Sequence, residues 1–157
     1  QFIYILSPVG LDVLPNERPK AVTRLIEIVK KLHLLKWVHL DLRWPNVIFD
    51  PVTQDFYLID SEFATPFDQP LPSDSLKTLQ DLPFQPSGCC PEIDWYSIGR
   101  MINRTNDISD NLRQHAEAFL SCDMEVIRSV LKRIKVNLVM METIIFVQVF
   151  SVYSRFY

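Results

Sequence analysis

The apolar residues of this chain recur with two periods, one typical of helices and one typical of short strands. A helical period runs over residues 20–35 and is set by Val22, Leu25, Ile26, Val29 and Leu32. The same kind of spacing predicts helices at 109–120 and 122–135. A further helix is predicted to start at Asp94, a residue suited to an N-cap position. The chain is therefore expected to be mainly helical.

Short apolar runs bounded by turn-forming residues predict strands in two places. Residues 2–6 are expected to form a buried strand that ends at a proline and a glycine. Residues 46–49 and 55–60 are expected to pair as a hairpin, because the segment between them has turn chemistry. The proline-rich stretch 61–93 is expected to be irregular. Together the patterns predict an α+β fold that is mainly α.

Composition agrees with one packed domain. The 157 residues are 48% hydrophobic and 22% charged, and the net charge of −3 gives no basis for nucleic-acid binding. The three cysteines form no C-x-x-C pattern, so neither a disulfide framework nor a zinc site is predicted. Reduced thiols and the lack of a basic signal region before F2-I-Y-I-L6 favour an intracellular, cytoplasmic protein. Because Gln1 stands where a Met would start a gene product, we expect the chain to begin inside a longer protein.

The tail 136–157 is rich in β-branched and aromatic residues. Three polar residues interrupt it, and Glu142 near its centre makes membrane insertion costly. A buried helix or strand is therefore expected there, with a membrane anchor as the alternative.

The segment W37-V-H-L-D-L-R-W-P-N-V-I-F49 carries the clearest chemical pattern of the chain. It presents His39, Asp41 and Asn46 in the order H-x-D-x-x-x-x-N, and a second acid, Asp60, ends the next apolar run. Protein kinases present their catalytic and metal-binding groups in this order. The alternative is that Asp41 and Asn46 only cap turns.

Phosphoryl transfer explains why these residue types are needed. One carboxylate accepts the proton of the attacking hydroxyl, a role that fits Asp41. Magnesium takes hard oxygen ligands, which Asn46 and Asp60 supply. The guanidinium of Arg43 can grip the transferred phosphate with two hydrogen bonds. The predicted catalytic residues are thus Asp41, Arg43 and Asn46, and the predicted metal ligands are Asn46 and Asp60.

On these residues, the chain from Phe2 to about Met101 resembles the C-terminal lobe of the protein-kinase-like superfamily. The wording L-R-W-P-N and L-S-P-V-G is similar to divergent fungal kinase-like proteins. The resemblance implies that residues 39–46 form the catalytic loop, that residues 60–62 form the metal loop, and that the central helix starts at residue 94. Residues 1–135 form the lobe fragment, with a hairpin that carries the metal site.

The resemblance also implies ligands and partners. Residues 6–10 match the hinge, so Ser7 and the floor residue Ile48 are expected to bind the nucleotide together with Asn46 and Asp60. Asp94 is expected to hold the catalytic loop through its backbone amides. The implied cofactors are ATP and Mg²⁺, and the implied partner is a protein substrate.

Several departures from the family pattern are present. Leu40 replaces the usual arginine, Ser61 and Glu62 replace the Phe and Gly of D-F-G, and P91-E92 lies unusually close to Asp94. The sequence has no glycine-rich loop and no strand lysine, so the N-terminal lobe is absent apart from its last strand and hinge. The isolated chain is therefore expected to be inactive on its own.

Three functions are compatible with the motif. The first is a protein-kinase-type phosphotransferase that moves the γ-phosphate of ATP to a Ser or Thr hydroxyl. The second is a small-molecule phosphotransferase of the aminoglycoside or choline kinase type, which the sequence I59-D60-S61-E62 resembles. The third is a pseudokinase-like interaction module. All three share the expected fold, so function depends on the site.

Overall fold

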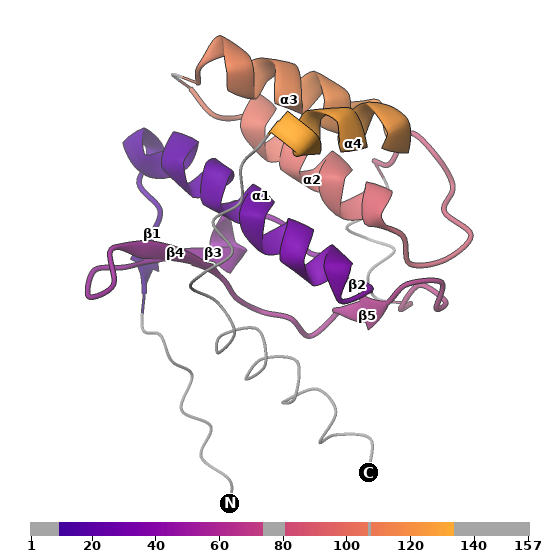
Figure 1. Cartoon of the computed structure of the whole chain (residues 1–157). Coiled ribbons are helices and arrows are strands. Elements are labelled where there is room, and N and C mark those ends of the chain that lie inside the picture. The colour runs from indigo at the N-terminus through magenta and orange to yellow at the C-terminus, as the bar shows by residue number, and fades with distance from the viewer. Residues whose placement is uncertain (1–9, 74–80, 107, 134–157) are drawn as a thin grey trace, which may run out of the picture.

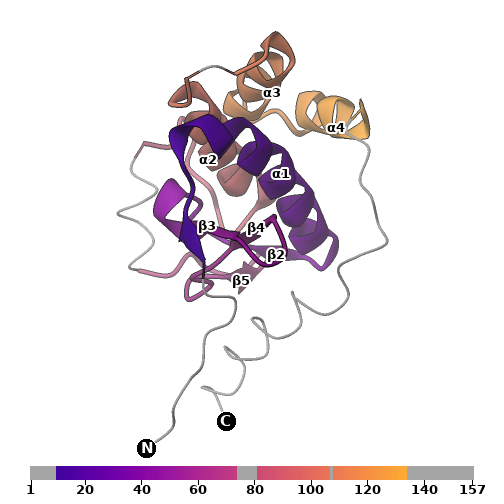
Figure 2. The same ribbon diagram turned by 90° about the vertical axis from the view of Figure 1, so that its left-hand side faces the viewer.

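The computed structural model of the chain describes residues 10–73, 81–106 and 108–133. Within them, helices lie above a small antiparallel sheet, in layers that Figure 1 and Figure 2 show from two sides. The helix α1 covers the sheet and packs on α2, which in turn packs on α3, and α4 contacts α3. Their bounds are α1 (Arg18–Leu34), α2 (Pro91–Asn103), α3 (Asp110–Leu120) and α4 (Met124–Arg133).

The main sheet is built on the predicted hairpin. Strands β3 (Val47–Asp50) and β4 (Asp55–Leu58) pair antiparallel, with Val47 opposite Leu58. The short strand β1 (Leu11–Asp12) joins the other edge of β3, which gives the order β1-β3-β4. A 3-10 turn at Pro15–Glu17 then leads the chain from β1 into α1.

The hairpin turn is held by one acid. The Asp50 carboxylate accepts hydrogen bonds of 2.8 Å from the Val52 amide and 2.8 Å from the Thr53 hydroxyl. These bonds, the one from the Val52 N–H first, hold the pKa of Asp50 below its ordinary value. The turn therefore fixes the register in which β4 pairs with β3.

A second, two-stranded pairing fixes the chain on either side of the motif. Strand β2 (Trp37–Val38) pairs antiparallel with β5 (Thr65–Pro66). The Phe67 amide also donates to the Lys36 carbonyl at 2.8 Å. The segment between β2 and β3 is thus anchored at both ends.

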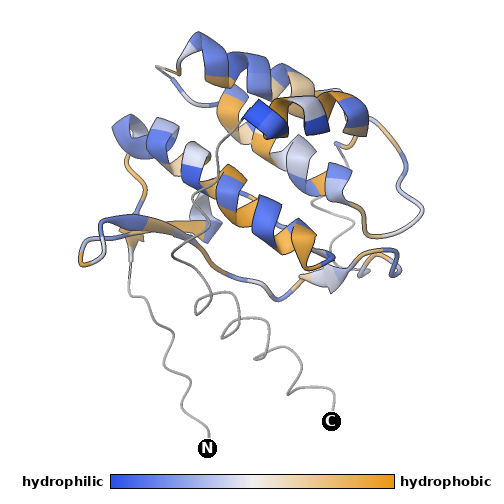
Figure 3. Ribbon diagram, viewed as in Figure 1, coloured by the Kyte–Doolittle hydropathy of each residue, from blue (hydrophilic) through white to orange (hydrophobic). Residues whose placement is uncertain are grey.

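The core lies where α1, α2 and α3 meet. Hydrophobic and hydrophilic residues alternate along the α1 ribbon in Figure 3, and most of its hydrophobic residues are buried, among them Val22, Leu25 and Ile26. This buried face packs with apolar residues of α2, and Trp95 stacks on Phe119 of α3 with ring centroids 5.1 Å apart. Each fully buried side chain of this size contributes roughly 1.5–3 kcal/mol. The α2–α3 approach needs Gly99, because a Cβ there would lie 2.9 Å from Leu120 Cγ.

Much of the predicted element pattern is confirmed. The helix expected at 20–35 is α1, which begins two residues earlier, and the helix expected at 109–120 is α3, with Ser109 as its N-cap. The expected hairpin is β3–β4. The helix expected at 122–135 is present as α4, whose described part ends at Arg133.

Two predictions about residues 61–94 are wrong in detail. Asp94 is not an N-cap: α2 begins at Pro91, with Cys90 as its extended N-cap residue. Proline is well suited to the first helical position, since its fixed φ fits the helix and its missing N–H is not needed there. The stretch expected to be irregular contains β5 and the first turn of α2.

Other predictions fall outside the described residues. These are the strand at 2–6, the hinge up to residue 9 and the tail at 136–157. Among the residues that are described, no helix has the length and apolar character needed to cross a membrane.

Candidate active site

The loop between β2 and β3 is held by a buried acid that lies far away in the sequence. One oxygen of Asp94 accepts the His39 amide at 2.9 Å, and the other accepts the Leu40 amide at 3.0 Å. The Asp94 side chain is fully buried. The backbone hydrogen bonds that the kinase resemblance implied for this residue are therefore present.

A histidine of α1 completes the environment of this acid. His33 Nε2 lies 2.9 Å from Asp94 Oδ2, and the His33 ring meets Trp95 edge-on at 5.0 Å. Burial alone would raise the pKa of Asp94, but the hydrogen bond and charge of His33 and the His39 amide outweigh it and lower the pKa. The contact between His33 and Asp94 joins residues 61 positions apart, so no local pattern in the sequence indicates it.

Leu40 has an unusual backbone conformation. Its φ is 69°, in the left-handed region that non-glycine residues rarely adopt. Its side chain is buried with Val38, Cys89 and Ile93. A leucine in place of the usual kinase arginine is thus explained locally, because this position faces an apolar cluster. Such a backbone costs on the order of 1–3 kcal/mol and persists only where neighbours enforce it, as Asp94 does here.

The three predicted catalytic residues meet at one carboxylate oxygen. Asp41 Oδ2 accepts from Asn46 Nδ2 at 2.8 Å and lies 3.0 Å from Arg43 Nε. Asn46 Nδ2 also donates to the Asp41 carbonyl at 2.8 Å. The 3-10 turn η2 (Trp44–Asn46) folds the chain back so that Asn46 reaches Asp41.

These residues differ in exposure. Asp41 and Asn46 are buried, whereas the Arg43 side chain is 54% exposed. The Asp41 carboxylate is therefore held by the buried amide of Asn46, and the guanidinium of Arg43 that pairs with it is exposed enough to change its rotamer. This arrangement suits a base whose guanidinium neighbour can turn toward a phosphate.

His39 is buried in the loop beside Asp41 and Asp94. It is 3% exposed, and burial lowers its pKa against the opposing charges of Asp94 and Asp41. The Asp41 amide donates to His39 Nδ1 at 3.4 Å, and Nε2 is buried without a hydrogen-bond partner among the described residues. The burial of the ring and its lowered pKa favour a structural role.

Asp60 emerges at the same end of the hairpin as Asn46. The Ile59 amide donates to the Asn46 carbonyl at 2.9 Å, which extends the β3–β4 ladder to the residue before Asp60. Asp60 is exposed and has a φ of 62°. Among the described residues, no three or more His, Cys, Asp or Glu side chains form a metal-binding group. A shared magnesium ion on Asn46 and Asp60 stays a prediction.

The residues expected to bind the nucleotide base are only partly described. Ser7 lies outside the described residues. Ile48 is 8% exposed, and the Gly10 backbone lies so close that a Cβ there would be 2.6 Å from the Ile48 side chain. Gly10 therefore lies against Ile48, and a nucleotide base can contact only the part of the Ile48 side chain that Gly10 does not cover.

A cleft of about 350 Å³ reaches Asp41 from the α2 side. Its wall on the loop side consists of Leu40, Asp41, Leu42, Trp44 and Pro45. The opposite wall belongs mostly to α2 and consists of Ser97, Arg100, Met101 and Arg104, with Asp81 at the edge. The sequence interpretation missed the two arginines, whose only signal is their four-residue spacing at the end of a helix.

The sequence matches no model of a known protein family, and no curated protein is significantly similar to it. The assignment of function therefore depends on the chemistry of this site.

Proposed function

We propose that the protein containing this chain is a phosphotransferase of the protein kinase type, which moves the γ-phosphate of ATP to a hydroxyl of a protein substrate. One observation carries the proposal. The buried carboxylate of Asp41 is held by Asn46 and Arg43, and Asp41 lines a cleft of about 350 Å³.

Asp41 is the proposed proton acceptor. Its Oδ2 atom is occupied by two donors, so Oδ1 is the atom left for the hydroxyl of the acceptor. A general base must lie within about 2.6–3.2 Å of the proton donor that it serves. A carboxylate held by two donors on one oxygen keeps the lone pairs of the other oxygen for this contact.

Asn46 and Asp60 are the proposed magnesium ligands. Both hydrogen bonds of Asn46 to Asp41 use Nδ2, so its carbonyl oxygen Oδ1 is left for a cation. Asp60 adds a carboxylate at the same end of the hairpin. Two hard oxygen donors suit magnesium, which takes its other ligands from water and phosphate. When bound, magnesium neutralises charge on the phosphate oxygens.

Arg43 is the proposed phosphate contact. Its side chain is 54% exposed, although the Asp41 carboxylate with which it pairs is buried. Because Asn46 Nδ2 also donates to Asp41 Oδ2, this oxygen keeps one partner when the guanidinium turns toward a phosphate.

The experiment measures ATP binding and phosphate transfer with the natural protein that carries this sequence. Asp41→Asn is expected to lower transfer by roughly 10²–10⁴-fold, the usual contribution of a general base, and to leave magnesium-dependent ATP affinity unchanged. Wild-type turnover by Asp41→Asn would overturn the assignment. The 157-residue chain alone is expected to transfer little, because it supplies no glycine-rich cover or lysine for the nucleotide.

A matched pair of variants tests the metal assignment. Asp60→Asn is expected to weaken magnesium-dependent ATP binding, while Asp68→Asn is expected to leave it unchanged. Both acids are exposed and both have a positive φ, 62° and 64°, which asparagine tolerates. Equal effects of the two substitutions would contradict a specific role for Asp60.

A further inference from the structure

The cleft beside Asp41 approaches the candidate base from a side that the nucleotide residues do not occupy. Its lining includes Asp41 but none of Asn46, Ile48 or Asp60. If the nucleotide is bound by those three residues, the cleft is the route left for the acceptor. A volume of about 350 Å³ is at the low end of the range for small-molecule sites, roughly 300–1,000 Å³, and suits a few side chains of a peptide.

The charges that line the cleft are unequally paired. Arg100 pairs with Asp81 at 2.8 Å, and Asp41 pairs with Arg43 at 3.0 Å. Arg104 also lines the cleft, is exposed, and forms no ion pair within the described residues. The lining therefore has one cation whose charge is not balanced by a neighbouring carboxylate.

Arg104 lines the same cleft as Asp41, the candidate base, but lies at the end of α2 and not on the loop. It is the C-cap residue of α2, one turn beyond Arg100, and its amide donates to the Arg100 carbonyl at 3.2 Å. A cation at a helix C-terminus also interacts favourably with the helix dipole, by about 0.3–1 kcal/mol. That local role does not use the guanidinium fork, which stays available for a carboxylate or phosphate.

We infer that the acceptor is an acidic peptide segment, in which an Asp, Glu or phosphorylated residue near the hydroxyl binds Arg104 while the hydroxyl meets Asp41. This inference rests on the proposed function and specifies its substrate class. Arg100 has a secondary part. The Asp81 side chain that it binds is 67% exposed, so an incoming anion can compete for the same guanidinium.

The test compares serine peptides that differ only near the serine, with glutamate, phosphoserine, alanine or lysine. Phosphate transfer is measured as kcat/KM with the natural protein, and binding is measured by fluorescence anisotropy of labelled peptides. The wild-type protein is expected to prefer the glutamate over the lysine peptide by about tenfold, or about 1.4 kcal/mol, because Arg104 attracts the one side chain and repels the other. The phosphoserine arm shows which anion binds better.

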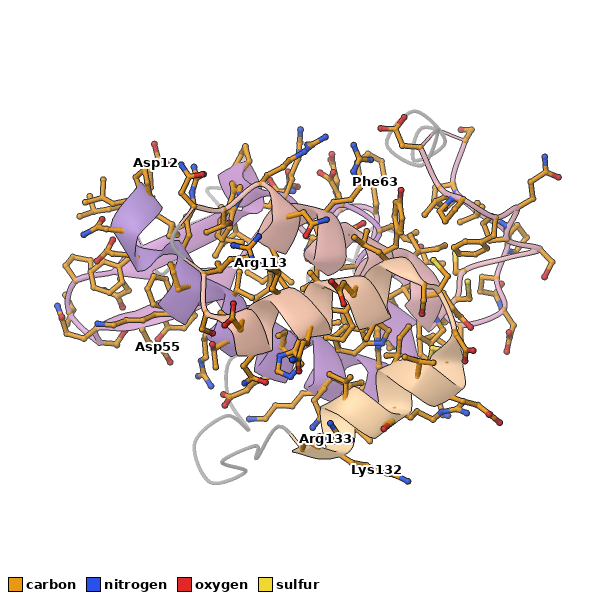
Figure 4. The ribbon with its side chains drawn as sticks, turned by 90° about the horizontal axis from the view of Figure 1, so that it is seen from above. Asp12, Asp55, Phe63, Arg113, Lys132 and Arg133 are labelled. Carbon is orange, nitrogen blue, oxygen red and sulfur yellow. The ribbon has the colours of Figure 1, made fainter. Side chains whose placement is uncertain are left out.

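Variants of Arg104 give the specific readout. Arg104→Gln is expected to reduce the preference for acidic peptides to near unity, Arg104→Glu to reverse it, and Arg104→Lys to retain part of it. Arg113→Gln is the matched control, because Arg113 is exposed on α3 and does not line the cleft. Figure 4 labels this residue on that helix. Thermal unfolding of each variant separates loss of the contact from loss of the fold.

The outcomes distinguish the two proposals. Transfer without any preference for acidic peptides, or a preference that Arg104→Gln does not change, overturns the inference and leaves the phosphotransferase intact. Arg104-dependent binding of acidic peptides without transfer overturns the proposed function and supports the cleft as an acidic-peptide site. Neither binding nor transfer of any peptide overturns both.

Discussion

The two sides of the candidate site are built differently. On the loop side, Asp41, Asn46 and Asp94 are buried and each makes at least two hydrogen bonds. On the ligand side, Arg43, Asp60 and Arg104 are exposed. The candidate base is thus held by the fold, whereas the cations proposed to bind phosphate and an acidic acceptor, and one of the two proposed metal ligands, are exposed. In such a site the fold positions the buried groups in advance, whereas the exposed side chains can adjust when a ligand binds.

The largest effect is expected at the buried acid that holds the loop. Asp94→Ala leaves the His39 and Leu40 amides and the His33 ring without their acceptor. Removing one partner of a buried polar group of this kind costs about 3–5 kcal/mol. Urea unfolding measures the change, and Asp12→Ala on the exposed strand β1 is the control, with an expected effect below about 0.5 kcal/mol. Equal losses in the two variants would mean that Asp94 does not hold the loop.

A smaller effect should separate two residues that contact the same oxygen. Asn46→Ala removes two buried hydrogen bonds to Asp41 and is expected to cost about 1–3 kcal/mol of unfolding free energy. Arg43→Ala removes an exposed donor from Asp41 Oδ2, which Asn46 still holds, and is therefore expected to cost only about 0.5–1.5 kcal/mol. Chemical denaturation of both variants tests this order. A larger loss at Arg43 would show that burial does not decide which side of the site is fixed.

Acid should weaken the buried side. Burial lowers the pKa of His39, and burial followed by the charge of Arg133 lowers that of His115. Because the folded pKa lies below the ordinary value of about 6.5, the unfolded chain takes up protons first. This stability is present above pH 6.5 and is lost as the pH falls below it.

The measurement is thermal unfolding between pH 7.5 and 5.5. The unfolding free energy should fall by at most about 1.4 kcal/mol per pH unit for each histidine. His115→Leu should reduce the slope, since it removes one of the two groups from a site far from the loop. An unchanged slope in His115→Leu would assign the whole effect to other groups.

The sequence predicted the local features of this molecule better than the distant ones. The α1 and α3 helices and the β3–β4 hairpin follow from periodicity and turn chemistry within single segments. The meeting of Asp41, Arg43 and Asn46 follows from their closeness in sequence. The role of Asp94 came from the family pattern, because no local signal links it to amides that lie 54 and 55 residues away.

The start of α2 and the cleft show why the rest was missed. Asp94 looks like an N-cap in isolation, but Pro91 fits the first helical position and the Asp94 carboxylate bonds to the loop instead. The cleft needs a loop and a helix that tertiary packing brings together. Arg100 and Arg104 therefore carry no signal of a site until the fold is known.

The smallest expected effect concerns two strained positions, one outside the candidate site and one on its exposed side. Lys36, just after α1, and Asp60, at the candidate metal site, have φ values of 64° and 62°. Glycine adopts this conformation without steric cost, so Lys36→Gly and Asp60→Gly are each expected to raise the unfolding free energy by about 0.5–1 kcal/mol. Function should then separate them. Lys36→Gly is expected to keep magnesium-dependent ATP binding, whereas Asp60→Gly is expected to lose it, because the second substitution removes a proposed metal ligand. Strained backbone conformations often persist at functional positions. Lys31→Gly, inside α1, is the control for glycine itself and is expected to cost about 1 kcal/mol. If Asp60→Gly gained stability and kept full magnesium-dependent binding, Asp60 would have no part in the metal site, and the strain at this residue would need another cause.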